Sequence, residues 1–484
     1  MPADDMQSER LKKLAILKEQ GIEPYPAESF RTHENAFFLG SFQSILASQE
    51  KITLAGRIMS LRGQGGIIFV DLFDGTARVQ ALIKKDSIGE KSFSLFSETV
   101  SVSDFIEVAG VAFVTKREMN SLLAETWRMV AKSLRQVPDE WFGIKDEDER
   151  YRKRYLDMIL NPEVASTVKK RSVFWNAIRS FMLERNFIEV ETPILETKTG
   201  GAEARPFITH HNTLDIDVYL RISHELWHKK LIVGGLPKVF EIGRVFRNEG
   251  MSYEHAQDYT HFEFYEAYQD ARKGVPMVIE MYRNAAEKTF GTLKFSIHGF
   301  DVDLGGEWKQ FDFNELMRNR YGFDPRDVSL DEVKKHLDKE KIKYEPTVCV
   351  GRGVDLLWKQ IRKTIGGPAV LTGMPIYLEP LAKKNAKDPR VVDRFQFLIG
   401  GSELGKGFNE LNDPQDQRER FEAQQSLRDA GDEEAQMADF EYVEAMEYGM
   451  PPMFGFGVSE RLFSFLAGKT IREAQTFPLM RPKS

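Results

Sequence analysis

Two short runs, Phe246–Gly250 and His261–Tyr265, constrain what this chain can fold into more than any other part of it. Their apolar residues predict two β-strands, and the polar stretch between them predicts the loop that joins the strands. Because successive side chains of a strand point to opposite faces, Glu263 and Tyr265 share one face of the second strand, while its two phenylalanines share the other. The phenylalanines predict a buried core, so the opposite face of this strand carries a carboxylate in a fixed position.

The first strand carries charges of both signs near its end. Arg247 and Glu249 are two residues apart, and on a strand this spacing puts both side chains on one face. A guanidinium binds phosphate well, and a carboxylate accepts hydrogen bonds from an amine. A rigid sheet holds such groups in place. The pattern therefore predicts a ligand-binding face rather than a surface hairpin with solvated charges.

Length and composition exclude several classes of protein. A chain of 484 residues with 42% apolar content exceeds a single hydrophobic core and predicts two or three domains. The only cysteine, Cys349, excludes an internal disulfide and a cysteine-rich zinc site. A formal charge of −7 provides no basic footprint for nucleic acid, so any RNA contact has to depend on local patches and stacking. No apolar run is long enough to cross a bilayer and no secretory signal follows Met1, so we expect no membrane contact and a cytoplasmic location.

Residues 49–142 are predicted to form a small β-barrel. Turn signals at 63–66 and 74–75 separate runs of strand-forming residues, and a helical pattern lies near 91–98. Five strands with a helix after the third are the layout of an OB-fold, a barrel that often binds single-stranded nucleic acid. The predicted strands are 52–59, 67–72, 77–84, 105–113 and 122–130.

The chain on either side of the barrel is predicted to be helical or mixed. Residues 1–48 are expected to form an N-terminal helical segment. Residues 143–484 are expected to form a larger domain, in which a long helix capped by Ser166 or Thr167 leads into a strand. A Lys-rich helical insert at about 325–375 is expected to pack on the outside of this domain without a functional role.

Three segments resemble, in order, the three motifs of class II aminoacyl-tRNA synthetases: the helix and strand before Pro193, the hairpin Phe246–Tyr265, and the segment Gly455–Arg461. Gly200–Phe207 and Glu410–Pro414 are similar to segments of the lysyl-tRNA synthetases of bacterial type. The resemblance covers nearly all of the chain. It implies an α+β fold, in which an N-terminal OB-fold β-barrel is followed by a class II synthetase catalytic domain built on an antiparallel sheet.

The resemblance implies a lysine–tRNA ligase, which activates lysine with ATP to lysyl-adenylate and transfers lysine to the 3′ end of tRNA(Lys). Such an enzyme needs no nucleophilic side chain, because positioning and neutralisation of phosphate charge supply the rate. Arg247 and Arg461 are implied as the catalytic cations, on the α- and γ-phosphates of ATP. The other implied ATP-binding residues are Glu249, His255, Glu403 and Tyr259, with Tyr259 stacking on adenine.

The implied amino-acid pocket is acidic. A lysine ammonium that leaves water without a partner is strongly disfavoured, so carboxylates have to surround it. The motif positions imply Glu263 and Glu410 near the side-chain amine and Glu225 near the α-amine. The other implied lysine-binding residues are Gly201, Tyr265, Lys406 and Phe408. The related aspartate and asparagine enzymes would need cationic or amide groups where this chain has carboxylates.

Mg²⁺ is implied as a cofactor that acts together with ATP, and hard oxygen ligands suit it. Glu403 and Gln396 occupy the positions of the family's metal-binding pair, although many relatives have a glutamate in place of Gln396. A carboxamide oxygen can bind Mg²⁺ but brings no charge. Lys406 stands where relatives usually have asparagine. Its ammonium would pair with the substrate carboxylate or replace part of the metal's charge, and both readings stay open.

The barrel is implied to bind the anticodon. Arg62, Phe69, Gln80 and Glu125 fall at family positions on its binding face, where Phe69 would stack on a base and the polar groups would bind base edges. Alternation predicts that Phe69 is exposed, because its neighbours in the sequence take the opposite face.

The implied partners are tRNA(Lys), L-lysine, ATP and a second copy of the chain, which pairs as a homodimer through residues 174–193. Two alternatives stay open. One is the related ligase that lysylates a translation factor, which typically lacks the OB-fold. The other is a catalytically inactive RNA-binding or regulatory relative. Arg247, Glu249 and Arg461 argue against it, whereas Gln396 and Lys406 leave room for it.

Overall fold

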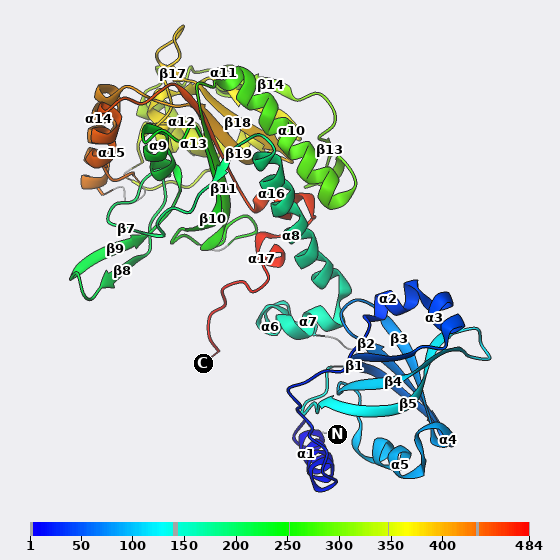
Figure 1. The fold of residues 1–484 in the computed structure, drawn as a ribbon. Coiled ribbons are helices and arrows are strands. Elements are labelled where there is room, and N and C mark those ends of the chain that lie inside the picture. The colour runs from blue at the N-terminus through cyan, green and yellow to red at the C-terminus, as the bar shows by residue number, and fades with distance from the viewer. Residues whose placement is uncertain (1–2, 139–143, 251, 347, 432–434, 484) are drawn as a thin grey trace. The chain divides into compact units, whose positions relative to one another are not determined.

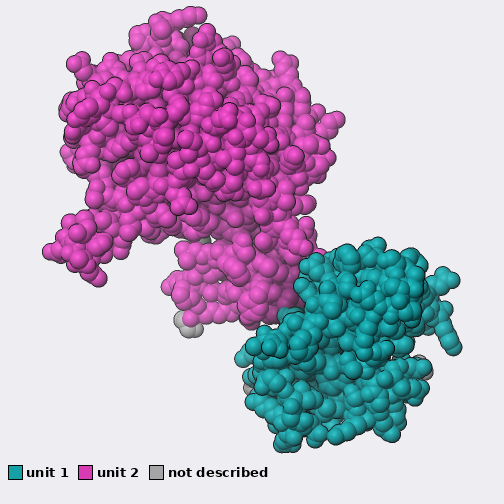
Figure 2. Space-filling view, in the orientation of Figure 1, with its two compact units in different colours: residues 1–143 teal, residues 144–484 magenta. Residues whose placement is uncertain are grey.

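The chain divides into two compact units, Met1–Gly143 and Ile144–Ser484 (Figures 1 and 2). The structure is a computed structural model, and it describes residues 3–138, 144–250, 252–346, 348–431 and 435–483. Within these ranges no helix has both the length and the apolar character needed to cross a membrane.

The first unit is a closed barrel of five strands in the order β1-β2-β3-β5-β4. Two helices follow the third strand, so the predicted OB-fold layout is confirmed. The strands are β1 (Lys51–Gln64), β2 (Ile67–Phe73), β3 (Arg78–Lys84), β4 (Phe105–Val114) and β5 (Asn120–Ala131), and the helices are α4 (Lys85–Ile88) and α5 (Glu90–Thr99).

The N-terminal residues belong to the same unit as the barrel. They form α1 (Ala3–Glu19), α2 (Asn35–Gly40) and α3 (Phe42–Ser48). Leu17 of α1, Phe38 of α2 and Phe42 of α3 are buried in the barrel's hydrophobic core. The helical segment thus closes the barrel core rather than forming a separate body.

The second unit is built on an eight-stranded sheet in the order β14-β15-β18-β19-β20-β11-β10-β6. Its central strands pair antiparallel, as predicted, whereas β6 and β14 at the two edges pair in parallel with their neighbours. The strands are β6 (Ile188–Glu189), β10 (Lys238–Phe246), β11 (Asp258–Ala267), β14 (Lys309–Asp312), β15 (Ala369–Thr372), β18 (Arg394–Ile399), β19 (Ser402–Asn409) and β20 (Met453–Ser459).

Smaller elements complete this unit (Figure 1). The helices are α6 (Glu147–Arg152), α7 (Arg154–Leu160), α8 (Pro162–Leu183), α9 (Glu225–Val233), α10 (Ala271–Phe290), α11 (Phe313–Tyr321), α12 (Leu330–Lys339), α13 (Val350–Arg362), α14 (Pro414–Asp429), α15 (Phe440–Glu447), α16 (Arg461–Leu466) and α17 (Ile471–Ala474). The remaining strands and one 3₁₀ helix are β7 (Leu195–Glu196), β8 (Ile208–His211), β9 (Ile216–Leu220), β12 (Lys294–Ile297), β13 (Phe300–Asp303), β16 (Met374–Pro375), β17 (Val391–Val392) and η1 (Ile376–Leu378).

One face of the large sheet is apolar and packs against α8 and α10. Phe262 and Phe264 of β11 are fully buried there, together with Phe174 and Ile178 of α8 and Met281 of α10. Each of these side chains buries enough apolar area to contribute roughly 2 kcal/mol. This burial fixes the orientation of the strand, so its alternate residues are turned to the opposite face.

The register of the sheet brings the predicted site residues side by side. Strand β20 pairs with β11 on one side and with β19 on the other. Two rows of paired residues therefore cross the middle of the sheet: Glu263, Gly457 and Lys406 in one, and Tyr265, Gly455 and Phe408 in the other. In both rows the central residue is a glycine, which leaves space above the sheet.

Two local predictions are wrong. Helix α8 begins at Pro162 after Asn161, so neither Ser166 nor Thr167 caps it. Proline suits the first position of a helix because its fixed φ is helical and its missing N–H has no helical partner there. Strand β10 ends at Phe246, so Arg247 and Glu249 lie in the loop after the strand.

The predicted helical insert is not an external addition. Val354 and Leu357 of α13 are fully buried in a core shared with Val333 of α12, and β15 adds a strand to the large sheet. The lysines of this segment lie on the outer faces of the two helices and in the loops beside them. We expected an outer layer because the sequence around α12 is strongly polar, but the amphipathic period of α13 buries its apolar side.

We predict that Gly110→Ala destabilises the barrel by about 2 kcal/mol, because a new methyl group would be overpacked. A Cβ at Gly110 would lie 1.9 Å from the backbone oxygen of Leu123 on β5. Hydrogen exchange of the β4 and β5 peptides in the full-length protein measures this loss. The control is Ala109→Gly, which should cost less than about 1 kcal/mol. Equal protection in Gly110→Ala and the wild type would contradict the close approach of β4 and β5.

Candidate active site

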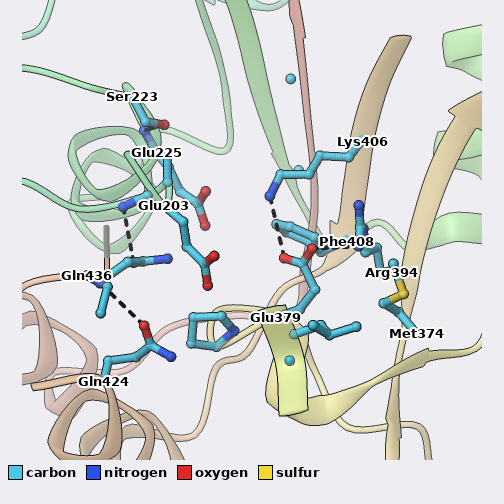
Figure 3. A pocket seen from close by; sticks show the side chains of 18 of the residues that line it. Glu203, Ser223, Glu225, Met374, Glu379, Arg394, Lys406, Phe408, Gln424 and Gln436 are labelled. Carbon is cyan, nitrogen blue, oxygen red and sulfur yellow. Dashed lines mark hydrogen bonds and ion pairs between the residues drawn. The ribbon is translucent and has the colours of Figure 1, made fainter. Parts of the chain in front are cut away.

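A cavity of about 280 Å³ lies over the open face of the large sheet. Its walls come from α9, β11, β19, β20 and α13, so segments far apart in the sequence meet there. Nine of the predicted site residues line it: Gly201, Glu225, Arg247, Glu263, Tyr265, Glu403, Lys406, Phe408 and Glu410. Figure 3 shows two groups of side chains that face each other, with Ser223 and Glu225 on one side and Lys406 and Phe408 on the other.

Three carboxylates form the acidic floor of the cavity. Glu225, Glu263 and Glu410 are 4%, 3% and 2% exposed, respectively. Glu225 begins α9, Glu263 lies in the middle of β11, and Glu410 follows the end of β19. Buried carboxylates are costly unless they are paired or hydrogen-bonded, so the partners of each one show what the floor can bind.

Glu263 already has a full set of partners. It accepts hydrogen bonds from the Ser223 hydroxyl at 2.6 Å, from the His224 N–H at 3.1 Å and from the Tyr265 hydroxyl at 3.1 Å. Burial opposes ionisation, but His224 and His261 nearby hold the pKa of Glu263 well below its usual range. Glu263 is therefore a charged and rigidly held group.

Glu410 has one oxygen free. Its Oε2 lies 2.5 Å from the Nζ of Lys229, whereas its Oε1 is buried and has no partner among the described residues. A Cβ at Gly455 would come within 2.1 Å of this Oε1 and 2.3 Å of the Tyr265 ring, so only glycine leaves the space there. Burial raises the pKa of Glu410 to about 8, despite the opposing effect of Lys229. A buried acceptor beside an open space is a place for a ligand's donor.

At the opposite end of the cavity, the backbone of Gly201 lies close to the side chains of Glu225 and Ser223. Gly201 has φ +82°, and a Cβ there would lie 2.8 Å from the Glu225 Cβ. Its N–H donates to the Gln436 side chain at 3.3 Å. Because a side chain would be both strained and blocked at this position, glycine is required. Burial raises the pKa of Glu225 here as well, and Lys229 acts against it at 2.7 Å.

Three histidines cluster beside Glu263: His224 and His228 are buried, whereas His261 is partly exposed and lines the cavity. The rings of His224 and His228 stack at 5.7 Å, and His228 lies 3.3 Å from Glu241. Burial lowers the pKa of His261 to about 3, so this ring is neutral near pH 7. His224 and His261 lie 3.6 Å and 3.4 Å from the Oε1 of Glu263 and so help to hold this carboxylate in place.

The wall opposite Glu225 is a chain of alternating charges (Figure 3). Glu379 lies 2.8 Å from Arg394 and 3.5 Å from Lys406, and the Lys406 ammonium is 5.2 Å from the centre of the Phe408 ring. The Lys406 side chain remains 41% exposed and lines the cavity. It is held loosely enough to meet a ligand's anionic group.

Arg247 is one of the cations that line the cavity. It lies just after β10, where its guanidinium carbon is 5.7 Å from the centre of the Tyr259 ring and one N–H donates to the Ile222 carbonyl at 3.3 Å. Tyr259 is only 8% exposed. Neither Tyr259 nor Glu249 nor His255 is part of the cavity lining, so their predicted contacts with adenine and phosphate stay predictions.

Arg461 lies on the far side of Glu403. It is the first residue of α16, and it donates to the Glu403 carbonyl at 2.8 Å. The Glu403 carboxylate accepts from the Trp358 indole N–H at 2.7 Å. Burial opposes the shift, but Arg394 holds the pKa of Glu403 below its usual value. Glu403 is thus an anion surrounded by cations.

Gln396 is placed less favourably for a metal. Its oxygen accepts from Arg394 and its NH₂ group donates to the Gly405 carbonyl at 2.9 Å. Among the described residues, no group of three or more histidine, cysteine, aspartate and glutamate side chains is arranged to hold a metal ion. The donor set of this cavity therefore does not fit an ion held by the protein alone, and Glu403 is the carboxylate that a ligand-borne ion could use.

Several lining residues were missed by the sequence analysis. Arg352 and Asp355 of α13 line the cavity, and Arg352 lies 2.9 Å from Glu203. From the sequence we expected this helix to pack on the outside of the domain, so these two residues were not predicted to be near the site. Lys229 was also missed, although its position four residues after Glu225 on a helix is the spacing of an intrahelical ion pair.

The four predicted anticodon residues lie on strands of the barrel. Arg62 and Phe69 are direct partners on β1 and β2, and Gln80 is on the adjacent β3. Phe69 is half-buried rather than fully exposed. Glu125 on β5 is in an ion pair with Lys51 at 2.6 Å. The first three residues therefore form one surface, although Arg62 lies 3.5 Å from Asp71 and Gln80 accepts a hydrogen bond from Ser121.

Comparison with known families assigns both units. A family model described as tRNA synthetases class II (D, K and N) matches residues 146–481, and a model described as OB-fold nucleic acid binding domain matches residues 52–135. The chain therefore belongs to the class II tRNA synthetases, in the group that comprises the D, K and N enzymes.

Curated relatives are similar over nearly their whole length. The chain is 40% identical over 489 residues to the lysine–tRNA ligase of Thermotoga maritima, which covers 99% of this chain and 96% of that protein. It is 39% identical over 489 residues to the lysine–tRNA ligase of Bacillus subtilis, with 99% and 98% covered. It is 41% identical over 483 residues to that of Thermoanaerobacter sp. strain X514, with 98% and 96% covered.

Proposed function

We propose that the chain is a lysine–tRNA ligase, which forms lysyl-adenylate from lysine and ATP and transfers lysine to the 3′ end of tRNA(Lys). The observation that carries this proposal is the acidic floor, where Glu410 keeps one buried oxygen free beside the space above Gly455. A ligand's ammonium is the group that such an oxygen binds best. The full-length similarity to lysine–tRNA ligases supports the same conclusion.

The cavity is matched to lysine from end to end. The ε-ammonium enters between Glu410 and Tyr265, near Glu263, and the aliphatic stem passes Tyr265 and Phe408, which are 3% and 4% exposed. The α-ammonium binds Glu225, and Gly201 lets the backbone approach. Aspartate or asparagine would leave these carboxylates unpaired, and an unpaired buried charge costs several kcal/mol, roughly.

The reaction itself needs only positioned charges. The lysine carboxylate attacks the α-phosphorus of ATP, the bond to the bridging oxygen breaks, and pyrophosphate leaves. Arg247 neutralises the charge that develops on the α-phosphate, and Arg461 binds the γ-phosphate. Lys406 orients the lysine carboxylate. A ribose hydroxyl of the tRNA 3′ end then attacks the lysyl carbonyl and AMP leaves, with the phosphate of AMP accepting the proton.

Glu249, His255 and Tyr259 complete the ATP site in this proposal, with the loop after β10 folding over the adenine. Mg²⁺ is brought by ATP, and it would neutralise phosphate charge there. Glu403 is the residue that would hold it. Gln396 is the proposed second ligand, although its oxygen would have to leave Arg394 first.

The barrel contributes tRNA selection. Arg62, Phe69 and Gln80 present a cation, a stacking face and a hydrogen-bonding group on adjacent strands, which suits single-stranded bases. Glu125 is the fourth proposed contact. The presence of this barrel does not suit the related ligase for a translation factor, and the free oxygen of Glu410 does not suit an inactive relative.

The active form in this proposal is a homodimer in the cytoplasm, paired through the region around residues 174–193. Five large apolar side chains around this region are exposed: Val173, Leu183, Ile188, Ile194 and Leu195. Exposed apolar side chains of this size are enriched where proteins interact, which supports this part of the proposal. Sedimentation of the purified chain tests this part of the proposal.

Amino-acid-dependent exchange of pyrophosphate into ATP tests the proposed function. The assay is run with each of the twenty amino acids, followed by charging of tRNA(Lys). Lysine alone should support strong exchange, and the same preparation should charge tRNA(Lys). Strong exchange with aspartate or asparagine, or none with lysine, would overturn the proposal.

We predict that Arg247→Ala lowers lysine-dependent exchange by roughly 100-fold or more, because a positioned charge on a developing oxyanion is worth about 3 kcal/mol. The matched control is Arg244→Ala, which removes an arginine on β10 that is paired with Asp258. The control should stay within a few-fold of wild type. Near-normal exchange in a folded Arg247→Ala protein would remove Arg247 from the site.

We predict that Glu410→Gln raises the KM for lysine about tenfold or more and leaves the KM for ATP nearly unchanged. A charged hydrogen bond is worth roughly 1.5–3 kcal/mol, and glutamine keeps the volume while it removes the charge. Steady-state exchange kinetics measure both constants, and the exposed Glu444 supplies the control Glu444→Gln. Loss of ATP affinity with normal lysine kinetics would assign Glu410 to the nucleotide site instead.

We predict that Phe69→Ala combined with Gln80→Ala slows tRNA charging about 30-fold, while exchange continues at the wild-type rate. One stacked base with its hydrogen bonds is worth roughly 2 kcal/mol. Phe37→Ala, at an exposed aromatic of α2, is the control and should charge normally. Equal losses in charging and exchange would contradict a role for this surface in tRNA binding.

A further inference from the structure

Lys229 is the most deeply buried cation in contact with the acidic floor, and the proposed reaction gives it no role. It lies on α9, its side chain is 0% exposed, and it does not line the cavity. Its Nζ lies 2.7 Å from Glu225 and 2.5 Å from Glu410. One ammonium thus joins the two carboxylates that stand at opposite ends of the proposed lysine site.

Each of these carboxylates faces the cavity from a different part of the chain. Glu225 is on the same helix as Lys229, one turn earlier, whereas Glu410 is held by a bridge to Ala382 after β19. Without a cation between them, two buried carboxylates would repel one another and turn away or bind a proton. Lys229 therefore fixes the distance between two elements that share no strand pairing.

The groups packed around this ion pair leave no substitute for Lys229. Glu263 and Tyr265 face it from β11, with the Tyr265 ring centre 5.9 Å from the Nζ, and Tyr442 faces it from α15. Lys406 on β19 acts on Glu225 from across the cavity, but its ammonium is paired with Glu379. Two of the facing groups are neutral phenols and one is a further carboxylate.

We propose that Lys229 is a positioning residue, which favours the charged forms of Glu225 and Glu410 and holds both side chains aimed into the cavity, so that three carboxylates match three ammonium groups once lysine is bound. The three ammonium groups are that of Lys229 and the two of the substrate. The inference depends on the proposed function and adds the reason why the floor prefers a ligand with two positive charges. A ligand with one ammonium leaves a buried carboxylate unpaired.

The charges of the floor also determine how lysine binding depends on pH. Burial raises the pKa of Glu410 to about 8 in the empty cavity, so near pH 7 the Glu225–Glu410 pair holds a proton. Lysine binding replaces that proton with an ammonium, and binding is therefore tighter as the pH rises towards 8. Removing Lys229 raises the pKa of the pair further, which moves this dependence to higher pH.

The test compares Lys229→Met with Lys230→Met. Methionine keeps the unbranched shape without the charge, and Lys230 is the next residue on α9, paired with Asp439 at 3.4 Å and not part of the cavity lining. Exchange kinetics are measured between pH 6.5 and 8.5. For Lys229→Met, the lysine KM at pH 7 should be at least tenfold higher than that of the wild type. The ratio of the two KM values should fall as the pH rises. The ATP KM and kcat should change less than threefold, and Lys230→Met should behave as wild type.

A ratio that is the same at every pH, a loss of kcat without a change in KM, or an equal effect of Lys230→Met would overturn the inference. Calorimetry on the wild type covers the case in which Lys229→Met does not fold. Lysine binding at pH 7, measured in two buffers of different ionisation enthalpy, should release close to one proton and fewer as pH rises past 8. No proton release overturns the inference while lysine-dependent exchange still supports the proposed function. Absence of that exchange in the wild type overturns both.

Discussion

The active site depends on buried carboxylates whose hydrogen-bonding and charge partners in the protein are incomplete. Burying a charge is costly, and the fold offsets most of that cost with fixed donors: Ser223 and Tyr265 for Glu263, and Lys229 for Glu225 and Glu410. What is left over is one buried oxygen of Glu410 that faces open space. The specificity of the cavity follows from that remainder, because a ligand has to bring the missing positive charge.

The central sheet makes this arrangement rigid. Phe262 and Phe264 are locked into the core under α8 and α10, so the alternate residues of β11 have no freedom to turn away. Gly455 and Gly457 on the neighbouring strand leave the space above the floor open, because a side chain at the first position would collide with Glu410 and one at the second would approach Glu263. Apolar burial on one face of the sheet thus fixes the charges on the other, which is how a folded scaffold preorganises a polar site.

Much of this architecture is visible in the sequence because it depends on local patterns. Alternation in β11 fixes which face carries Glu263, and turn signals separate the five strands of the barrel. The start of α8 at Pro162 also has a local signal, because proline favours the first position of a helix. The strand end at Phe246 and the inward position of α13 depend on tertiary packing, which a local pattern does not contain. The contacts of Lys229 with Glu410, and of Glu379 with Arg394 and Lys406, likewise join residues that lie apart in the sequence, whereas the contact of Lys229 with Glu225 is a local i, i+4 pair.

A crystal structure of the chain with lysine and a non-hydrolysable ATP analogue tests the central claim most directly. The account predicts the ε-ammonium about 3 Å from the Oε1 of Glu410 and the α-ammonium at a similar distance from Glu225, with Lys229 still joining the two carboxylates. The contradicting result is a lysine whose ε-ammonium points away from Glu410, or a Lys229 ammonium that has left the pair and entered the cavity.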